Sequence, residues 1–584
     1  MPLLGRHWHI LLIWLCVSAA LIVQGWSEIV MHSGWDPDDQ LRLVQLRDFI
    51  AGQSWFDTIQ YRMNQPSGAP MHWSRMVELP LAFIVMSLRP LVGQSVAEMI
   101  ATTAVPLLLL GWITIMLARI AERISSREAG VIAALITLSS AALLMQLRPM
   151  RIDHHGWQIA MAVLALSTIF WSDSRKAGSI LGIALAFWLH ISLEGAVMTA
   201  GFFLFVGMRW VLDPARAQRL LWTVISFVTA SLLLFMSTQA RGFYATSFCD
   251  TISPPHIWGF LFAAFILVPT IIMRPSDWRL RLGASVIASV GAILIILNLA
   301  PQCVGGAFGS MDLLVREYWY SNVHEGLPIW HQSWRTALSL SAGLCCGAAS
   351  WIFLFRRMKG DGRQRLIIMG FFLLYGLVLS ILVIRTISVA SAYAIPVTAA
   401  LIAALFERYR QSKIPAIRLG LVAIMLLFLV PGAVVSTMLQ AIPKPADAEN
   451  PSAVAANASC QSALSVAALT DIPDAYFIAP FDMGPMILAQ TPHAVLASSH
   501  HRNEQAMHDQ IEIFRSAPAH AYRLLTSRGI THLVACKHEA ELGLYAKKDP
   551  EGLWAMIDNG KIPGWLEPLP DRGKGIKVWR VRYR

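Results

Sequence analysis

Residues 9–25 read HILLIWLCVSAALIVQG, and residues 35–52 read WDPDDQLRLVQLRDFIAG. The first stretch is an apolar run of near-spanning length, and the second places Asp36, Asp38 and Asp39 shortly beyond its end. Carboxylates this close raise one another's pKa unless a cation or a basic partner joins them. The two stretches together predict a membrane span followed by a candidate site at its water edge.

Apolar runs of similar length recur from this first span to about residue 440. The chain has a mean hydropathy of +0.53, and only 14% of its 584 residues are charged. This composition predicts a mostly α-helical, polytopic membrane protein. The net charge of +11 does not indicate a nucleic-acid partner, because the basic residues form short clusters between apolar runs, as cytoplasmic loops do.

The spacing of these basic clusters predicts the topology. Alternate loops are basic, and counting the apolar runs between them gives about thirteen helices. The N-terminus, which carries Arg6, is then expected in the cytoplasm, and the C-terminus outside. No small-residue cleavage site follows the first run, so we expect an uncleaved helix rather than a signal peptide. The expected outer loops are residues 26–78, 147–156, 238–256 and 300–335, with a short turn near Arg385.

The last part of the chain has a different character. Residues 441–459, AIPKPADAENPSAVAANAS, have the composition of a linker. Short β-like runs such as AYFIAP, AVLAS, THLVAC and IKVWRVRYR then alternate with helical stretches such as EQAMHDQIEIFRSA. This pattern predicts a transmembrane domain over residues 1–438 and a small α/β domain over residues 439–584 on the outer face.

Four of the seven cysteines lie in segments expected outside the membrane, where disulfides persist. Cys249 and Cys303 belong to two outer loops, and Cys460 and Cys536 both belong to the C-terminal domain. These placements favour the pairs Cys249–Cys303 and Cys460–Cys536. The alternative is that the cysteines are reduced, small apolar residues, because spacing alone does not prove connectivity.

Charged side chains recur in the same set of outer loops. Besides the first acid cluster these are RIDHHGWQ at residues 151–158, YSNVHEGLP at residues 320–328, and Arg385. Carboxylates with a histidine suit Mg²⁺ or Mn²⁺, whereas cysteine-poor loops argue against a structural zinc site. Arginines beside such a cation suit a phosphorylated ligand. Separately, Asp153 could be a helix N-cap, Glu325 a solvated acid, and Arg385 a residue that snorkels to lipid headgroups.

These motifs resemble those of the catalytic subunits of oligosaccharyltransferases, which are GT-C membrane glycosyltransferases. Family members place a catalytic aspartate nine and ten residues ahead of an Arg-Asp or Arg-Glu pair, and counting back from Arg47 and Asp48 selects Asp38. Lipid A aminoarabinose transferases are similar more weakly, with an acidic pair like Asp38 and Asp39. The resemblance also covers the architecture, with thirteen helices, a large first outer loop and an outer C-terminal domain.

Three further motifs follow in order. RIDHHGWQ resembles the family's DxD or Asp-His-His element, SNVHEGLP resembles its SVSEHQP loop, and VIRTISVASAYAIPV resembles the late helix whose arginine binds the lipid-linked phosphate. The resemblance implies transfer of a sugar or glycan from a polyprenyl-(pyro)phosphate donor in a bacterial inner membrane. The implied roles are catalytic for Asp38, Asp39 and Glu325, metal-binding for Asp38, Asp153, His155 and Glu325, and phosphate-binding for Arg385 and Arg75.

One motif departs from the family pattern. The WWDYG sequence that recognises the acceptor sequon in protein N-glycosylating members corresponds here to PFDMG, which keeps Asp482 and Gly484 and lacks both tryptophans. The sequence is therefore compatible with a protein, a glycan or a lipid as the acceptor. FDMG is equally compatible with an ordinary strand-to-helix turn.

Two other functional classes remain as alternatives. A secondary transporter would place its polar residues at mid-membrane, and a non-catalytic envelope assembly protein would not need acids, histidines and an arginine on one face. His190 and Glu194 are left out of the predicted site, because their stretch is expected to turn at the outer surface.

Overall fold

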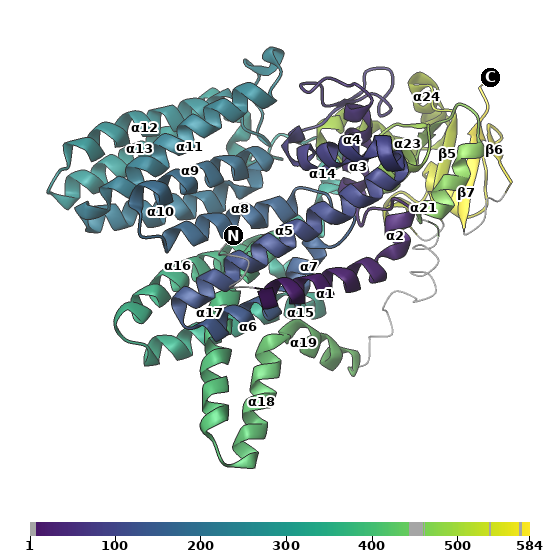
Figure 1. Ribbon diagram of the computed structural model, residues 1–584. Helices are drawn as coiled ribbons and strands as arrows, with labels where there is room; N and C mark the ends of the chain where they lie inside the picture. Colours follow the sequence, from purple (N-terminus) through teal and green to yellow (C-terminus); the bar gives the residue numbers. More distant parts are fainter. Residues whose placement is uncertain (1–7, 443–459, 461, 537–538, 571–574, 584) are drawn as a thin grey trace.

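The computed structural model describes residues 8–442, 460, 462–536, 539–570 and 575–583 (Figure 1). Most of the predicted linker and Arg6 lie outside these residues. Eight described helices are long and apolar enough to cross a membrane, or ten spans if each of two bent pairs counts as one. The chain is therefore a multi-pass, mostly helical protein, and the count of about thirteen spans stays a prediction.

The eight helices are α5 (Gln94–Ile124), α10 (Ala196–Leu212), α11 (Ala217–Thr238), α12 (Pro254–Met273), α13 (Trp278–Leu299), α15 (Trp334–Arg357), α16 (Gly360–Leu382) and α17 (Ile387–Gln411). The bent pairs are α6 (Arg127–Thr137) with α7 (Ala141–Leu147), and α18 (Pro415–Leu429) with α19 (Pro431–Gln440). Shorter apolar helices are α1 (Trp8–Gln24), α4 (Leu79–Val92) and α8 (His155–Ile169), and α9 (Ser174–Ile191) packs between α8 and α11.

Helix α17 lies at the centre of the helical domain. Its first sixteen residues, Ile387 to Ile402, are all buried, and it contacts α5, α6, α8, α15, α16 and α18. Small residues such as Ala390 and Ala394 allow this close packing, with Gly376 and Gly347 approaching them from α16 and α15. The centre of the fold therefore holds the start of α17, directly after Arg385, in a fixed position.

The C-terminal domain has a five-stranded sheet in the order β4-β3-β5-β7-β6. Its strands are β3 (Tyr476–Ile478), β4 (Ala494–Val495), β5 (His532–Cys536), β6 (Leu566–Pro568) and β7 (Ile576–Val581). β3 pairs in parallel with β4 and β5, while β7 pairs antiparallel with β5 and β6. Helices α22 (Met483–Gln490), α23 (Glu504–Arg515), α24 (Pro518–Arg528), α25 (Ala540–Lys548) and α26 (Leu553–Asp558) complete the predicted small α/β domain.

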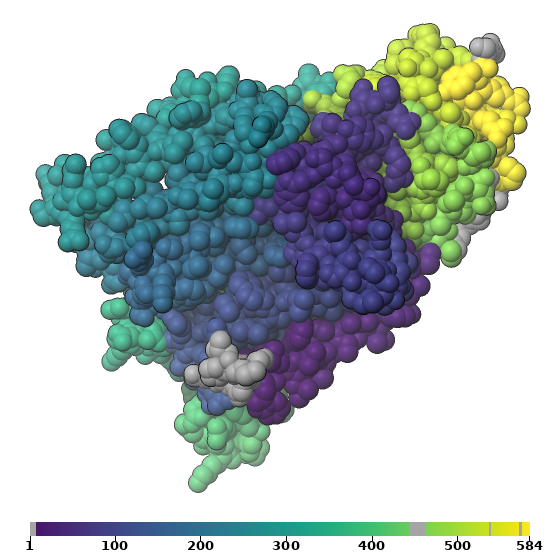
Figure 2. Space-filling model, turned by 45° about the horizontal axis from the view of Figure 1, so that its top comes forward, coloured from purple at the N-terminus to yellow at the C-terminus, as the bar shows by residue number. Residues whose placement is uncertain are grey.

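The segment after α2 (Trp26–Val30) joins the two parts of the fold. It forms α3 (Pro37–Ile50) and the hairpin of β1 (Ile59–Gln60) and β2 (Ala69–Pro70), and Met63 forms a parallel bridge with Val495 at the edge of the sheet. Leu41 and Met71 share a hydrophobic cluster with C-terminal residues. Figure 2 shows the purple N-terminal surface directly against the green and yellow C-terminal domain.

Two disulfides occur, and they are the pairs favoured from the sequence. Cys249–Cys303 links the α11–α12 loop to the segment after α13, with a Cα–Cα distance of 5.2 Å. Cys460–Cys536 ties the start of the C-terminal domain to β5, with a Cα–Cα distance of 6.0 Å. Cys16, Cys345 and Cys346 are free.

Candidate active site

The acid cluster opens helix α3, and each of its aspartates has a different set of partners. Asp36 is the N-cap: its side chain accepts a hydrogen bond of 3.0 Å from the Asp39 backbone N–H, and Pro37 follows at the first helical position. This local motif fixes the direction of α3. Asp38 and Asp39 then project from the first turn, where the helix dipole favours negative charge.

Asp39 fastens α3 to the segment before α8. Its Oδ1 accepts from the backbone N–H groups of Ile152 and Asp153 at 2.8 and 3.1 Å, and its Oδ2 accepts from Arg151 Nη1 at 3.0 Å. Arg151 also pairs with Asp36 and, through Nη2, with Asp153 at 2.9 Å. The first and second outer loops predicted from the sequence therefore meet around one buried arginine.

Asp153 and His155 form a buried pair at the start of α8. Asp153 Oδ1 accepts from the His155 backbone N–H at 2.9 Å, and Oδ2 lies 2.7 Å from His155 Nδ1. Although burial opposes ionisation, Arg151 and His155 hold the pKa of Asp153 well below its usual range. Asp153 therefore orients His155 in two ways: it accepts a hydrogen bond from the backbone N–H of His155, and it pairs with the imidazole ring.

The far ring nitrogen of His155 is available for a ligand. Nε2 is buried and makes no hydrogen bond to the described residues, although His155 lines a large cavity. Beside it, burial and the charge of His155 lower the pKa of His154 to about 3, so the His154 ring is neutral. A carboxylate on one nitrogen and an open second nitrogen is the arrangement of metal-binding histidines.

Asp38 points into the same cavity and pairs with the C-terminal domain. His500 Nε2 lies 3.3 Å from Asp38 Oδ1, while His500 Nδ1 is 2.8 Å from Ser498 Oγ. His500 is buried and also packs edge-on against Trp73. Burial raises the pKa of Asp38, but the hydrogen bond and charge of His500 outweigh it, so the net pKa is lowered. Asp38 is therefore ionised at neutral pH.

Arg385 lies between two glutamates, in the short helix η9 (Ile384–Thr386) that joins α16 to α17. Its Nη1 contacts Glu194 and its Nη2 contacts Glu325, the acid of the SNVHEGLP loop. Glu194 in turn accepts from Gln158 Nε2 at 3.3 Å and lies 3.7 Å from His154 Nε2. Glu194 therefore joins Arg385, through an ion pair, to the neutral His154 and to Gln158 at the start of α8.

These groups surround a cavity of about 1070 Å³. Its polar wall contains Asp38, His154, His155, Glu194, Glu325, Arg385, Asp482 and His500, and its apolar wall contains Val197, Met198, Leu379, Val383 and Val389. The apolar residues belong to, or directly follow, helices long enough to cross a membrane. The same cavity therefore has an apolar wall and a wall of charged side chains.

Three predicted site residues, Asp39, Asp153 and Arg75, lie outside this cavity wall. Asp153 is directly behind His155, as its contacts require. Arg75 is fully buried and donates to the carbonyls of Gln45 and Asp57 and to the side chains of Gln53 and Glu78. Its contacts are those of a residue that holds the first loop together.

Glu194, His500 and Asp482 line the cavity but were absent from the predicted site. Glu194 was set aside because its stretch was expected to face water, yet it contacts Arg385. His500 lies in the segment ASSHHRN of the C-terminal domain, and its only sequence signal is a second histidine pair resembling that of RIDHHGWQ. Asp482, in the FDMG turn between β3 and α22, lines the cavity as well, and burial raises its pKa.

The residues present fit a divalent cation. One ligand atom each from Asp153, His154 and His155 lies within 4.8 Å of the others, as is also true of Asp36, Asp39 and Asp153. Asp38 and Glu325 add carboxylates from two further segments, close enough for the charge of Asp38 to affect Glu325. His154 Nε2 already lies 3.7 Å from Glu194, so the set that suits Mg²⁺ or Mn²⁺ is these carboxylates with the single imidazole of His155.

Comparison with solved structures identifies the fold. The archaeal oligosaccharyltransferase AglB from Archaeoglobus fulgidus, in complex with an inhibitory peptide and a dolichol-phosphate, superposes with a TM-score of 0.67 and 13% identity over 100% of this chain and 75% of that one. The A. fulgidus oligosaccharyltransferase in complex with Zn and sulfate gives a TM-score of 0.59 and 14% identity over 98% and 73%.

ArnT from Cupriavidus metallidurans bound to undecaprenyl phosphate gives a TM-score of 0.44 and 11% identity over 97% and 98%. No protein-family model and no curated protein sequence matches the chain. The chain therefore has the GT-C membrane glycosyltransferase fold of the archaeal oligosaccharyltransferase, as its motifs predicted.

Proposed function

We propose that this protein is a glycosyltransferase that moves a sugar or glycan from a polyprenyl-(pyro)phosphate donor to an acceptor at the periplasmic face of a bacterial inner membrane. The observation that carries the proposal is the cavity, which brings Asp38, His155, Glu325 and Arg385 together beside an apolar wall. The dolichol-phosphate in the A. fulgidus complex is a ligand of the same chemical class.

Arg385 would bind the donor phosphate. Its guanidinium is only 19% exposed, and two glutamates hold it at the cavity wall. A planar guanidinium in a poorly solvated position forms strong paired hydrogen bonds with phosphate oxygens. The adjoining apolar residues Leu379 and Val383 would accept the first isoprene units, because they line the cavity on the same side as Arg385.

Asp38 would act on the acceptor. It is ionised, lies on the rim of the cavity and is 30% exposed, so a bound hydroxyl or amide can donate a hydrogen bond to it. His500 would hold the carboxylate in position and keep its pKa lowered despite burial. Asp38 thereby orients the nucleophile and accepts its proton as the new glycosidic bond forms.

Asp38, His155 and Glu325 would hold a divalent cation, with Asp153 fixing the ring of His155. When bound, the cation neutralises the negative charge that develops on the leaving phosphate. Asp39 has a supporting role in the proposal. Its carboxylate is occupied by Arg151 and by the backbone N–H groups of Trp35, Ile152 and Asp153, so it fixes the loop that bears Asp153.

The acceptor is set by the wall formed by the C-terminal domain. Asp482 and Glu541 line the cavity opposite the helices, in the region where sequon recognition would require the missing tryptophans. Burial raises the pKa of both groups, and in either protonation state their oxygens accept hydrogen bonds from hydroxyl groups. This wall is suited to a hydroxyl-rich acceptor such as a glycan or a glycolipid.

The test compares Asp38→Asn with Asp57→Asn in the source bacterium. Both substitutions remove one carboxylate from the first outer loop, but the Asp57 side chain accepts from Ile59 and Tyr61 of the same loop and does not line the cavity. We expect Asp38→Asn to accumulate a lipid-linked glycan and to lose a surface glycoconjugate, and Asp57→Asn to behave as wild type. Unchanged glycans in Asp38→Asn, with normal protein levels, would exclude the transferase and leave a transporter or an assembly protein.

A further inference from the structure

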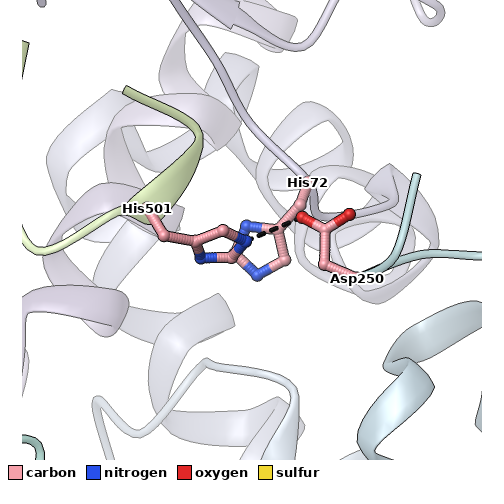
Figure 3. A group of neighbouring side chains, drawn as sticks. All are labelled: His72, Asp250 and His501. Carbon is pink, nitrogen blue, oxygen red and sulfur yellow. Dashed lines mark hydrogen bonds and ion pairs between the residues drawn. The ribbon is translucent and has the colours of Figure 1, made fainter. Parts of the chain in front are cut away.

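A second cluster of metal-competent side chains lies at another part of the cavity rim. His72 follows β2 in the first loop, Asp250 adjoins the disulfide-bonded Cys249, and His501 begins η11 (His501–Asn503) of the C-terminal domain (Figure 3). The three residues are separated by 178 and 251 positions along the chain, yet one ligand atom from each lies within 4.8 Å of the others.

Contacts within the cluster arrange it around the Asp250 carboxylate. His501 Nε2 is 2.8 Å from Asp250 Oδ2, and the ring centres of His72 and His501 lie 4.6 Å apart. Figure 3 shows the two rings beside each other, next to the Asp250 carboxylate. Arg502 donates to both carboxylate oxygens at 2.7 and 2.8 Å. Asp250 is therefore held ionised and oriented by an outer partner, which is how metal-ligating carboxylates are supported.

His72 is left without a matching partner. Its Nδ1 is buried and makes no hydrogen bond to the residues that the structure describes. A buried acceptor nitrogen with no donor is costly, and a cation between the two rings and the carboxylate would satisfy it.

We propose that His72, Asp250 and His501 form a zinc site, separate from the cation site at Asp38, His155 and Glu325. Two imidazoles and one carboxylate are a ligand set of Zn²⁺, whereas Mg²⁺ prefers oxygen donors. The two sites are separate in that none of these three residues belongs to the other cation site.

The position of the cluster indicates a structural role for the zinc site. It joins the first loop, the disulfide-bonded α11–α12 loop and the C-terminal domain, and both His72 and His501 line the cavity. His72 and His501 directly precede and follow the packed pair Trp73 and His500. A zinc ion here would clamp the C-terminal domain over the cavity and hold His500 against Asp38.

The test measures zinc in the full-length, detergent-purified protein after chelator treatment, readdition of Zn²⁺ and desalting. We expect one zinc per chain by elemental analysis, retained in Glu325→Gln and in His508→Ala, which removes a histidine of the same domain that pairs with Asp312. His72→Ala and His501→Ala should weaken zinc binding by about 100-fold or more, since even outer partners contribute 10- to 100-fold.

Cobalt substitution in the wild-type chain provides a measurement that does not depend on how the variants fold. Co²⁺ bound by two imidazoles and a carboxylate at low coordination number gives visible d–d bands, and Zn²⁺ should abolish them by displacement. Wild-type protein that binds neither ion at micromolar concentration would overturn the proposal. Zinc bound equally by wild type and by folded His72→Ala would overturn it too, while zinc lost only in Glu325→Gln would assign the ion to the first site.

Discussion

Replacing Arg385 by alanine tests the donor-binding half of the proposed site. Charge-assisted hydrogen bonds contribute about 1.5–3 kcal/mol each, and 1.4 kcal/mol corresponds to tenfold in affinity. The guanidinium is only 19% exposed, so little solvent screening reduces this contribution. The substitution also leaves Glu194 and Glu325 unneutralised where the phosphate binds. We therefore expect Arg385→Ala to bind a polyprenyl phosphate about 100-fold more weakly than wild type.

The contact between Glu194 and Arg385 allows a second test of the expected loss of phosphate affinity. If the weakening comes partly from the exposed charge of Glu194, then Glu194→Gln in the Arg385→Ala background should recover up to about tenfold, because one repulsive charge is removed. In the wild-type background Glu194→Gln should change phosphate affinity much less, since Arg385 keeps Glu325 as a partner. Such a difference between backgrounds is what coupled residues produce.

The assay is equilibrium binding of a polyprenyl phosphate to the purified protein in detergent micelles, followed by quenching of tryptophan fluorescence. Trp188 and Trp319 line the cavity and report on its occupancy. Arg89→Ala, at the exposed end of α4, is the control for loss of an arginine. Equal affinities for wild type and Arg385→Ala would refute the assignment of Arg385 to the phosphate.

Two further substitutions have clear expected outcomes. His500→Ala removes the hydrogen bond and charge that contribute most to lowering the pKa of Asp38, so that pKa should rise. Transfer needs the ionised carboxylate and is lost as the pH falls through this pKa, so the acid limb of the pH–rate profile should move to higher pH. An unchanged pH–rate profile would contradict this. Glu78→Gln leaves Arg42 as an uncompensated buried charge and should destabilise the fold by about 3–5 kcal/mol in thermal unfolding, against little change for the exposed Glu128→Gln.

Much of the fold follows from local patterns in the sequence. Apolar runs predicted the membrane helices, and the runs AYFIAP, AVLAS, THLVAC and IKVWRVRYR predicted four strands of the C-terminal sheet. The Asp-Pro pair at residues 36 and 37 specified the start of α3, because an N-cap and a first-turn proline act over neighbouring residues. Hydropathy and capping are local properties, so one sequence is enough to read them.

The site was less predictable, because its contacts connect distant segments. Glu194 meets Arg385 across 191 positions, and His500 reaches Asp38 from another domain. Arg75 shows the converse problem, since its sequence neighbours do not reveal that four protein groups already occupy its guanidinium. Local sequence gives the type of a charged residue, whereas its partners depend on the tertiary fold.

The charges around the cavity connect donor binding with cation binding. Asp36, Asp39 and Asp153 share Arg151, and Glu194 and Glu325 share Arg385, so carboxylates outnumber the arginines they contact. Two like charges 4 Å apart repel by about 4 kcal/mol at an effective dielectric constant of 20. A phosphate entering this cavity alone would add to that repulsion, whereas carboxylates that already hold a cation would leave Arg385 free to attract it. We infer that the acid cluster of α3 favours cation binding before donor binding.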